Sequence, residues 1–338
     1  MEICAYCDLN IIRQNLLHFK LKGKRLLFMV KANAYGHGII EVAKATEDIV
    51  DYFGVATVFE GLKLRKSGIT KPILVSIFFC DEAKFYPKYD LTAAVFLKEH
   101  IFALSTEAKK VGKWTNAFIK CDTGMNRLGV KGENLEKLLG VAKNASFIEF
   151  RGMFSHLRLS NEMQLRQFET DMHLYKKNLG NGIFHILSTN SADLNIDTDM
   201  IRVGIGGYGY AAGALPALSV YTKVICSKYA KKGEFVSYGS YKLKRSTNLA
   251  VVFGGYYDGI KRIGQSIVIA GKRCKVLNVS CMDMAVVDTG EYTARAGECA
   301  CILGEGYTAE DIAKDTDTIS YEVLTSLDKG RLKRVYFS

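Results

Sequence analysis

Residues 30–38 read Val30-Lys31-Ala32-Asn33-Ala34-Tyr35-Gly36-His37-Gly38. The run before Lys31, residues 25–30, is mostly apolar and typical of a strand, whereas residues 39–44 have the spacing of a helix. Lys31 is therefore predicted to lie where a strand ends and a loop begins, and in β/α sheets and barrels that end carries the chemistry. Lys31 is a candidate amine for covalent bonding to a carbonyl cofactor. By spacing alone, a solvated loop lysine is an equally good interpretation.

Eight apolar, strand-like segments alternate with amphipathic segments along the first two thirds of the chain. The predicted strands are residues 25–30, 52–56, 72–78, 91–96, 117–122, 147–155, 183–187 and 200–205. The clearest predicted helices are residues 10–19, with Asp8 as N-cap, and residues 59–67, 98–111, 132–143 and 162–178. This rhythm is typical of a (β/α)8 barrel, whereas a doubly wound sheet rarely needs eight such units.

After residue 222 the pattern changes to short strands separated by glycine turns, with one helical stretch at residues 308–313. The predicted strands there are residues 235–241, 249–253, 266–270, 274–279, 285–287 and 299–303. The sequence therefore predicts an α/β chain in which a (β/α)8 barrel is followed by a mainly-β C-terminal domain. The barrel is expected over residues 10–222 and the β domain over residues 223–338, with residues 1–9 as a strand that joins the β domain.

Composition narrows the class of protein. The 338 residues are 48% hydrophobic and 24% charged, which is ordinary for a globular protein. No apolar run is long enough to cross a bilayer and the start lacks a secretion pattern, so a cytoplasmic protein is expected. The net charge of +11 comes without a nucleic-acid-binding motif, so no nucleic-acid partner is expected. The nine cysteines include one C-x-x-C pair, Cys4 and Cys7, so reduced thiols and no metal site are expected.

Polar residues follow four of the later predicted barrel strands. Arg127 lies in a loop where its planar fork would suit a carboxylate, although a surface ion pair is the alternative. His156 comes at the end of the sixth predicted strand, where it is a candidate site residue. The alternative is that a lone histidine at this position has a structural role. Asn190 and Ser191 lie in a hydroxyl-rich run that favours phosphate. Gly204 begins a G-x-G-x-x-G run, but its late position and the absence of a following helix argue against a dinucleotide fold.

The stretch from Lys31 to Gly38 resembles the pyridoxal-phosphate lysine motif of alanine racemases, and further motifs match that family in order along nearly the whole chain. The resemblance implies that Lys31 holds pyridoxal 5'-phosphate as an internal aldimine. His156 would stack on the cofactor. The resemblance also implies that the phosphate of the cofactor is contacted by Tyr35, Asn190, Ser191, the amides of Gly204 and Ile205, and Tyr321.

Arg202 bears on the type of reaction. In the racemase family the matching arginine faces the pyridine nitrogen of the cofactor. A guanidinium is always charged, so it would leave that nitrogen unprotonated and weaken the electron sink. The related decarboxylases on this fold usually have a glutamate there. Arg202 therefore favours racemisation over decarboxylation.

The resemblance also assigns the substrate contacts. Arg127 and the Met282 amide would bind the substrate carboxylate, while Tyr256 and Asp283 lie at the pocket rim. The matching lysine of the family is carbamylated, which implies the same for Lys120. The physical motive is that an ammonium beside Arg127 is repulsive, whereas a carbamate reverses the sign.

Racemisation needs a proton removed from one face of Cα and returned on the other. Lys31 would serve one face and Tyr238, from the partner subunit of a homodimer, the other. A chain Tyr238–His156–Arg202 would stabilise the phenolate. The sequence thus predicts an enzyme that interconverts L- and D-alanine and supplies D-alanine for peptidoglycan.

Two alternatives stay open at this point. One is a racemase of another small amino acid such as serine, and the other is a pyridoxal-phosphate carrier on the same barrel. Such carriers lack the β domain, so Tyr238, Met282 and Tyr321 argue against a carrier. Departures from the family pattern, at Tyr257, Met284 and residues 331–334, fall at the pocket rim and dimer edge.

Overall fold

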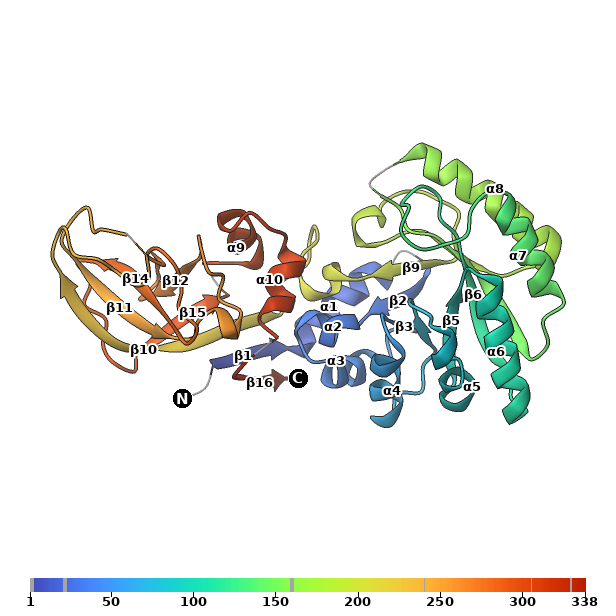
Figure 1. Ribbon diagram of the computed structural model, residues 1–338, viewed down its shortest axis with the longest axis horizontal. Helices are drawn as coiled ribbons and strands as arrows, with labels where there is room; N and C mark the ends of the chain where they lie inside the picture. The colour runs from blue at the N-terminus through green and yellow to red at the C-terminus, as the bar shows by residue number, and fades with distance from the viewer. Residues whose placement is uncertain (1–2, 21–22, 159–160, 240, 305, 329) are drawn as a thin grey trace. The chain divides into compact units, whose positions relative to one another are not determined.

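The computed structural model describes residues 3–20, 23–158, 161–239, 241–304, 306–328 and 330–338 (Figure 1). The chain divides into two compact units. The barrel unit comprises residues 12–34 and 39–214, and the C-terminal unit comprises residues 35–38 and 215–338 with the described part of residues 1–11. Residues 35–38, which directly follow the segment that carries Lys31, thus belong to the C-terminal unit.

The barrel unit is built on eight parallel strands in the order β8-β7-β6-β5-β4-β3-β2-β9. Their bounds are β2 Arg25–Met29, β3 Tyr52–Val55, β4 Ile73–Val75, β5 Leu91–Val95, β6 Thr115–Lys120, β7 Ile148–Phe154, β8 Ile183–His185 and β9 Met200–Val203. Main-chain bonds from Asp199 N to Phe184 O (2.9 Å) and from Arg202 N to Leu187 O (3.1 Å) close the ring next to β8 and β9. The predicted barrel class is confirmed.

One layer of side chains fills the barrel interior. It contains a single buried residue from each of seven strands, namely Leu27, Tyr52, Leu74, Ala94, Phe118, Phe154 and Met200. Each large apolar side chain of this kind contributes about 1.5–3 kcal/mol when fully buried. The layer holds the strands in one register, so the residues that follow the carboxyl ends of the strands have fixed positions.

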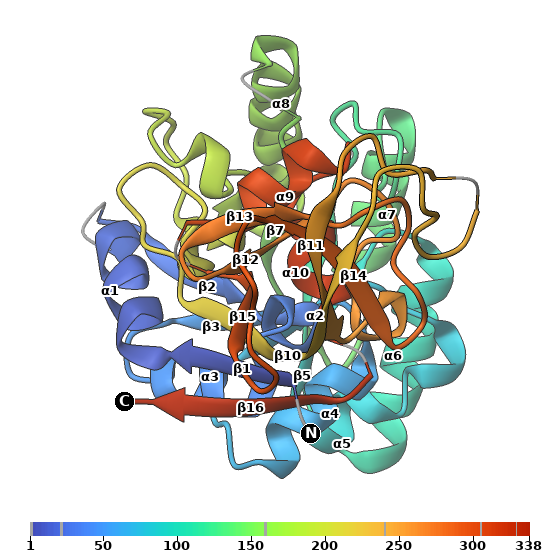
Figure 2. The same ribbon diagram turned by 90° about the vertical axis from the view of Figure 1, so that its left-hand side faces the viewer.

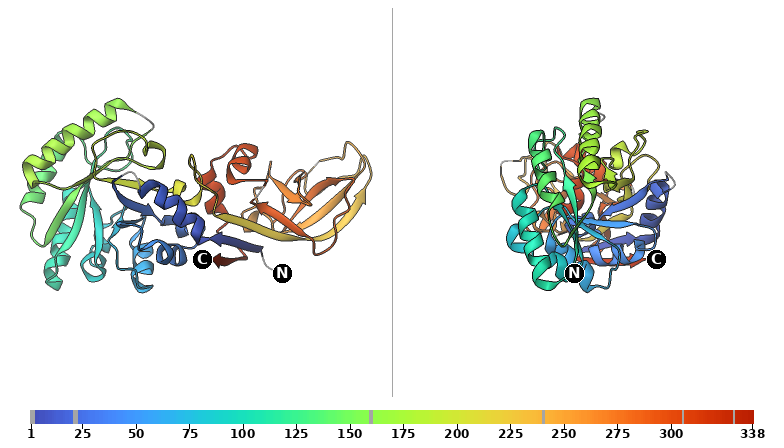
Figure 3. Two further views of the ribbon diagram at one scale, coloured as in Figure 1. Left: turned by 180° about the vertical axis from the view of Figure 1, so that it is seen from behind. Right: turned by 90° about the vertical axis from the view of Figure 1, so that its right-hand side faces the viewer.

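The helices of the barrel unit lie on the outside of the strands (Figure 3). Their bounds are α1 Leu9–Lys20, α3 Ile39–Thr46, α4 Val58–Lys66, α5 Phe85–Tyr89, α6 Lys98–Val111, α7 Glu133–Lys143 and α8 Glu162–Leu179, with the 3-10 helices η1 Cys80–Glu82, η2 Thr189–Ser191 and η3 Ile205–Tyr208. Asp8 caps α1 as predicted, since its Oδ1 accepts from the amides of Asn10 (2.9 Å) and Ile11 (3.1 Å).

The C-terminal unit is a mainly-β sheet in the order β13-β12-β15-β10-β1-β16, with β11 paired to β10 and β14. Its strands are β1 Ile3–Asp8, β10 Leu218–Ala230, β11 Thr247–Phe253, β12 Ser266–Ile269, β13 Lys272–Lys275, β14 Met284–Gly290, β15 Cys299–Leu303 and β16 Leu332–Phe337. Helices α9 Ala309–Asp315 and α10 Ser320–Ser326 and the 3-10 helix η4 Tyr256–Asp258 complete it. Strand β1 runs antiparallel to β10 and parallel to β16 (Figure 2).

Two features of this unit differ from the sequence pattern. Residues 235–241 were expected to form a strand, but the described residues there form turns and a single bridge between Phe235 and Lys242; residue 240 lies outside the described residues. Positive φ angles at Ser237 (57°) and Gly239 (89°) interrupt the extended path. Residue 222, the expected domain boundary, lies inside the long strand β10.

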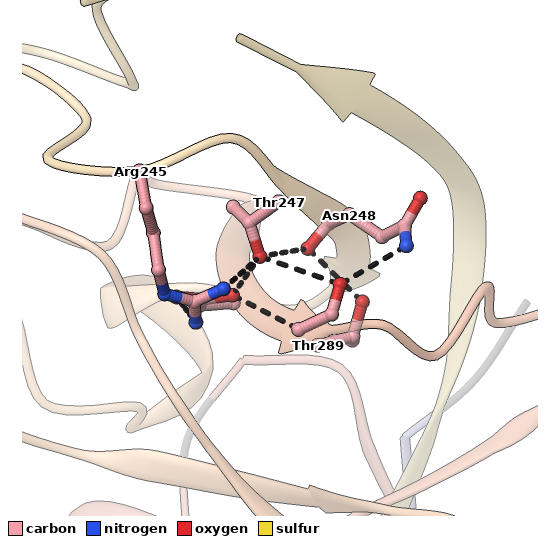
Figure 4. A network of polar contacts seen from close by, with 6 residues as sticks. Arg245, Thr247, Asn248 and Thr289 are labelled. Atoms are coloured by element: carbon pink, nitrogen blue, oxygen red, sulfur yellow. Dashed lines mark hydrogen bonds and ion pairs between the residues drawn. The ribbon is translucent and has the colours of Figure 1, made fainter. Parts of the chain in front are cut away.

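Side chains join β11 to β14 where their register shifts, between Asn248 and Leu249. Figure 4 shows this network. Thr247 Oγ1 donates to Asp288 Oδ1 (2.5 Å), and the Arg245 guanidinium donates to both residues (3.0 and 2.8 Å). Asn248 Nδ2 donates to the carbonyl of Gly290 (3.0 Å). These bonds hold together the end of the strand pair where the main-chain ladder is irregular.

Candidate active site

The segment that carries Lys31 is a left-handed turn. The element labelled α2 (Lys31–Tyr35) has φ angles of 51°, 52° and 54° at Ala32, Asn33 and Ala34, with ψ between 46° and 52°. For residues with a Cβ this conformation costs roughly 1–2 kcal/mol each. Asn33 tolerates a positive φ, but the alanines on either side of it have no such preference, so the sequence gives little local reason for the whole turn. The turn therefore depends on contacts with the rest of the barrel unit.

Two hydrogen bonds hold the turn in place. The amide of Ala34 donates to the carbonyl of Val30 (2.9 Å), and the amide of Ala32 donates to Oε1 of Glu60 on α4 (2.7 Å). These bonds connect the turn that carries Lys31 to the residue after β2 and to helix α4. The position of Lys31 at the end of a barrel strand agrees with the prediction.

The surroundings of the Lys31 amine favour its neutral form. Burial lowers the pKa of Lys31 and the nearby guanidinium of Arg127 lowers it further, while the carboxylate of Glu60 opposes the change. A neutral amine is the nucleophilic form of lysine. The site therefore makes Lys31 a better nucleophile at neutral pH than a solvated lysine.

Arg202, on β9 beside β2, is the most extensively bonded side chain of the site. It is 7% exposed. One terminal nitrogen lies 2.7 Å from Nδ1 of His185 and donates to the carbonyl of the same residue (3.1 Å). The other donates to the carbonyls of Ser155 (2.6 Å) and Ile186 (3.3 Å) and lies 3.4 Å from Nδ1 of His156. Burial lowers the pKa of Arg202 to about 10, so the guanidinium remains charged at neutral pH.

Both histidines beside Arg202 are neutral. Burial and the charge of Arg202 hold the pKa of His185 well below its ordinary value, and they lower the pKa of His156 to about 4. His185 stacks on Phe154, with ring centroids 4.9 Å apart, and its Nε2 has no hydrogen-bond partner among the residues that the structure describes. Sequence reasoning missed His185, although a histidine inside the apolar run 183–187 is the signal that could have found it.

Replacement of Arg202 by alanine is expected to destabilise the protein by about 3 kcal/mol or more, because it leaves buried carbonyls without donors. Urea unfolding measures this loss. The matched control is Arg166→Ala on α8, since Arg166 is 75% exposed and pairs with the exposed Glu162, so its change should stay within about 0.5 kcal/mol. Equal unfolding midpoints for the two variants would contradict the structural role assigned to Arg202.

Lys120, at the end of β6, is a buried amine among other cations. It is 8% exposed and its Nζ lies 5.6 Å from the ring centroid of Phe154. Burial lowers the pKa of Lys120 to about 8, with further lowering from Arg127, Arg202 and Lys31. The barrel unit therefore gathers four cationic side chains, namely Lys31, Lys120, Arg127 and Arg202. Such a cluster is suited to anionic ligands.

Hydrogen bonds and a close backbone approach fix the base of the loop that carries Arg127. Asp122 Oδ1 accepts from the amides of Gly124 and Asn126, both at 3.0 Å. Gly129 has a φ of 136°, and a Cβ there would lie 2.5 Å from the backbone carbon of Cys121. Arg127 itself is exposed. The loop thus has a fixed base and an accessible guanidinium.

The candidate phosphate-binding residues follow β8 and β9. Asn190 and Ser191 lie in η2, and Ile205 begins η3. Thr189 Oγ1 accepts a hydrogen bond from the amide of Gly204 (3.0 Å). The Gly204 amide therefore already has an acceptor within the barrel unit, and its contact with a phosphate stays a prediction.

In the C-terminal unit, two candidate tyrosines lie side by side. The ring centroids of Tyr35 and Tyr321 are 5.9 Å apart. Burial raises the pKa of both phenols, so both keep their protons at neutral pH. Protonated phenols can donate hydrogen bonds to an anion, which is the role that the sequence predicts for this pair.

The rim residues Tyr256, Met282 and Asp283 lie on two adjoining loops of the same unit. The amide of Tyr256 donates to the carbonyl of Cys281 (3.0 Å). Arg331 joins the two loops, because its Nε lies 3.0 Å from Asp258 Oδ1 and a terminal nitrogen lies 3.1 Å from Asp283 Oδ1. The run at residues 331–334, which departs from the family pattern, thus supports the rim.

Tyr238 lies on a turn of the C-terminal unit that adjoins the loop of Met282, because Ser237 Oγ donates to the carbonyl of Val279 (3.0 Å) and lies 3.4 Å from Cys281 Sγ. It is 70% exposed, and its carbonyl accepts a hydrogen bond from Nδ2 of Asn278. Met282 and Tyr256 are also exposed, at 53% and 45%. The structure therefore places His156 and Lys120 near Arg202 and pairs Tyr35 with Tyr321, whereas Tyr238 is exposed to solvent.

Comparison with known proteins decides the family. The family described as "Alanine racemase, N-terminal domain" matches residues 7–212, and "Alanine racemase, C-terminal domain" matches residues 217–336. The chain belongs to the alanine racemase family. The alanine racemase of Symbiobacterium thermophilum is 33% identical over 365 residues, which cover 98% of this chain and 96% of that protein.

Solved alanine racemase structures have the same fold. The crystal structure from the D-cycloserine producer Streptomyces lavendulae matches with a TM-score of 0.96 and 29% identity, over 100% of this chain and 97% of that one. The Bartonella henselae alanine racemase, described with covalently bound pyridoxal phosphate, matches with a TM-score of 0.90 and 25% identity over 100% of both chains. Alanine racemases are isomerases that depend on this cofactor, so the predicted family, enzyme class and cofactor are confirmed.

Two further observations concern the class of protein. In the part of the chain that the structure describes, no helix is long and apolar enough to cross a membrane. Over the same residues, no three His, Cys, Asp or Glu side chains are placed to hold a metal ion.

Proposed function

We propose that this chain interconverts L-alanine and D-alanine with pyridoxal 5'-phosphate, and that Lys31 and Tyr238 are the two proton carriers. The observation that carries the proposal, beside family membership, is the buried and charged Arg202 held between two neutral histidines. The residues present fit the cofactor, because a lysine of lowered pKa stands among cations suited to an anion. When bound, the cofactor acidifies the Cα–H of the amino acid joined to it.

Arg202 sets the type of reaction in this proposal. A charged guanidinium cannot accept a proton, so Arg202 would leave the ring nitrogen of a bound cofactor unprotonated. The cofactor would then be a weaker electron sink, which disfavours side reactions. Racemisation, which needs only removal and return of one proton, remains favourable.

The two proton carriers act on opposite faces of Cα. Lys31 takes or returns the proton on one face through its Nζ. Tyr238 does so on the other through its phenol oxygen, with the help of a chain Tyr238–His156–Arg202. Support for the inner half of that chain is the 3.4 Å contact of Arg202 with His156 Nδ1. Because His156 is neutral, its remaining nitrogen can donate toward the phenol oxygen.

The remaining candidates bind and orient. Arg127 and the Met282 amide hold the substrate carboxylate. Tyr256 and Tyr321 narrow the entrance to small amino acids, and Asp283 lies with Tyr256 at the rim. The phosphate is held by Tyr35, Asn190, Ser191, the amides of Gly204 and Ile205, and Tyr321. The supporting observations are the fixed loop under Arg127, the Tyr35–Tyr321 pair and the position of Ser191 in η2.

The functional unit is proposed to be a cytoplasmic homodimer that supplies D-alanine for peptidoglycan, with Tyr238 reaching the partner's site. The exposure of Tyr238, Met282 and Tyr256 supports this, because exposed apolar groups of the C-terminal unit are then covered by a second copy. Sedimentation of the purified protein should give twice the mass of one chain.

Lys120 is expected to carry a carbamate, formed when the neutral amine bonds to carbon dioxide and loses a proton. Because burial lowers its pKa to about 8, the reactive neutral form is abundant just above neutral pH, and the carbamate should increase as the pH rises through that value. Carbon-13 NMR in labelled bicarbonate should show a signal that Lys120→Ala removes. Absence of the signal in the intact protein would contradict the assignment.

The direct test of the proposed function combines the purified protein, pyridoxal 5'-phosphate and L-alanine. Formation of D-alanine, with little activity on L-serine, is the expected result. Preference for serine would replace the substrate assignment, and cofactor binding without turnover would favour the carrier alternative.

A further inference from the structure

We propose that Glu60 is a positioning residue for Lys31. One oxygen of its carboxylate holds the left-handed turn that carries Lys31, and the other holds the first turn of α4. The inference deepens the proposed function and rests on it, because it assigns a partner to the amine that binds the cofactor. Glu60 was not among the candidates that the sequence indicated.

The two oxygens of Glu60 have separate partners. Oε2 accepts from the amides of Ala56 (2.8 Å) and Thr57 (3.1 Å), and Thr57 Oγ1 accepts from the amide of Glu60 (3.3 Å). This is a capping box, which needs only one oxygen of the glutamate. Oε1 is left to accept from the amide of Ala32 (2.7 Å), 28 residues away in the sequence. A local helix cap therefore also supports a distant loop.

Ala32 begins the left-handed run, with a φ of 51°, and it is exposed. Its hydrogen bond to Glu60 therefore acts as a restraint on the position of the turn, not as relief of a buried donor. The amide of Ala32 belongs to the peptide that follows Lys31, so its hydrogen bond fixes the direction in which the Lys31 side chain leaves the backbone. Glutamine has one acceptor oxygen and aspartate is shorter by one methylene, so neither replacement can accept hydrogen bonds both at the start of α4 and from the amide of Ala32.

Glu60 is also the acidic group that faces the Lys31 amine. The other groups with which Lys31 interacts electrically are Arg127, Lys120 and His156. The carboxylate counters the cations and thereby limits how far the pKa of Lys31 falls. Glu60 thus sets both the direction and the charge state of the amine.

The test uses the full-length chain freed of cofactor with hydroxylamine. The rate of competitive acetylation of Lys31 is quantified by mass spectrometry over a range of pH. The midpoint of the rate against pH reports the pKa of Lys31, and the plateau of the rate at high pH reports the accessibility of the amine. In Glu60→Gln the midpoint should fall by about 0.5 pH or more, so acetylation near neutral pH should be about threefold faster. In Glu60→Asp the midpoint should stay near that of the wild type while the plateau rises, because the charge remains but the reach is lost.

Thr57→Ala is the matched control, because it removes a capping bond from α4 and leaves the Glu60 carboxylate in place. It should lower the melting temperature without moving the midpoint or the plateau. An unchanged midpoint in Glu60→Gln, an unchanged plateau in Glu60→Asp, or an equal shift in Thr57→Ala would overturn the proposal. The proposed function fails on a different result, retention of cofactor by Lys31→Ala, so the two failures are distinguishable.

Discussion

Replacement of Lys31 by alanine is expected to give a folded chain that retains no pyridoxal 5'-phosphate after gel filtration and racemises alanine at least about a thousandfold more slowly. In the proposed function the amine holds the cofactor covalently and is also one of the two proton carriers, so both functions should be lost together. Its surroundings support this, since burial and Arg127 lower its pKa and so increase the neutral form.

Cofactor absorbance of the gel-filtered protein and the rate of D-alanine formation measure the two losses. The matched control is Lys98→Ala on α6, because the Lys98 side chain is 66% exposed and pairs with the exposed Glu99. The control should keep both cofactor and activity. A Lys31→Ala protein that retains absorbance and forms D-alanine at the wild-type rate would refute the role of this amine.

Replacement of Tyr238 by phenylalanine is expected to slow the L-to-D direction by about a hundredfold to ten-thousandfold while cofactor binding stays unchanged. The variant lacks only the phenol oxygen, which is proposed to carry the second proton. Because Tyr238 is 70% exposed and lies outside the core, folding should not change. Tyr229→Phe on β10, where the tyrosine is 66% exposed, is the matched control and should be fully active.

A mixing experiment tests whether Tyr238 acts across a dimer. If the site is shared, a mixed dimer of Lys31→Ala and Tyr238→Phe chains contains one site with both groups intact. Mixing the two inactive proteins should then restore activity. If both groups act within one chain, each site keeps one defect and no activity returns. Equal loss of cofactor and turnover in Tyr238→Phe would count against its role as a proton carrier.

Much of the barrel could be predicted from local pattern. The helix predicted at residues 98–111 has those bounds as α6, and the predicted strands differ from the observed ones by a few residues at their ends. Residues 235–241 were predicted to form a strand, and this prediction is wrong. Polar and apolar residues alternate there as they do in a strand, and the positive φ at Ser237 cannot be read from the amino-acid composition. The sequence pattern did not predict the long strand β10, since apolar and polar residues alternate only weakly in its second half.

The amino-acid sequence by itself determined that this chain is a (β/α)8 barrel with a β unit, and that Lys31, Lys120, Arg127, His156 and Arg202 lie in or just after barrel strands. Hydrophobic periodicity and motif order are local properties, so they can be read without coordinates. Only the tertiary structure decided the left-handed turn after Lys31, the contact of Ala32 with Glu60 and the contact of Arg202 with His185. These depend on groups far apart in sequence whose hydrogen bonds outweigh the local preferences of the backbone, and no local pattern encodes such pairs.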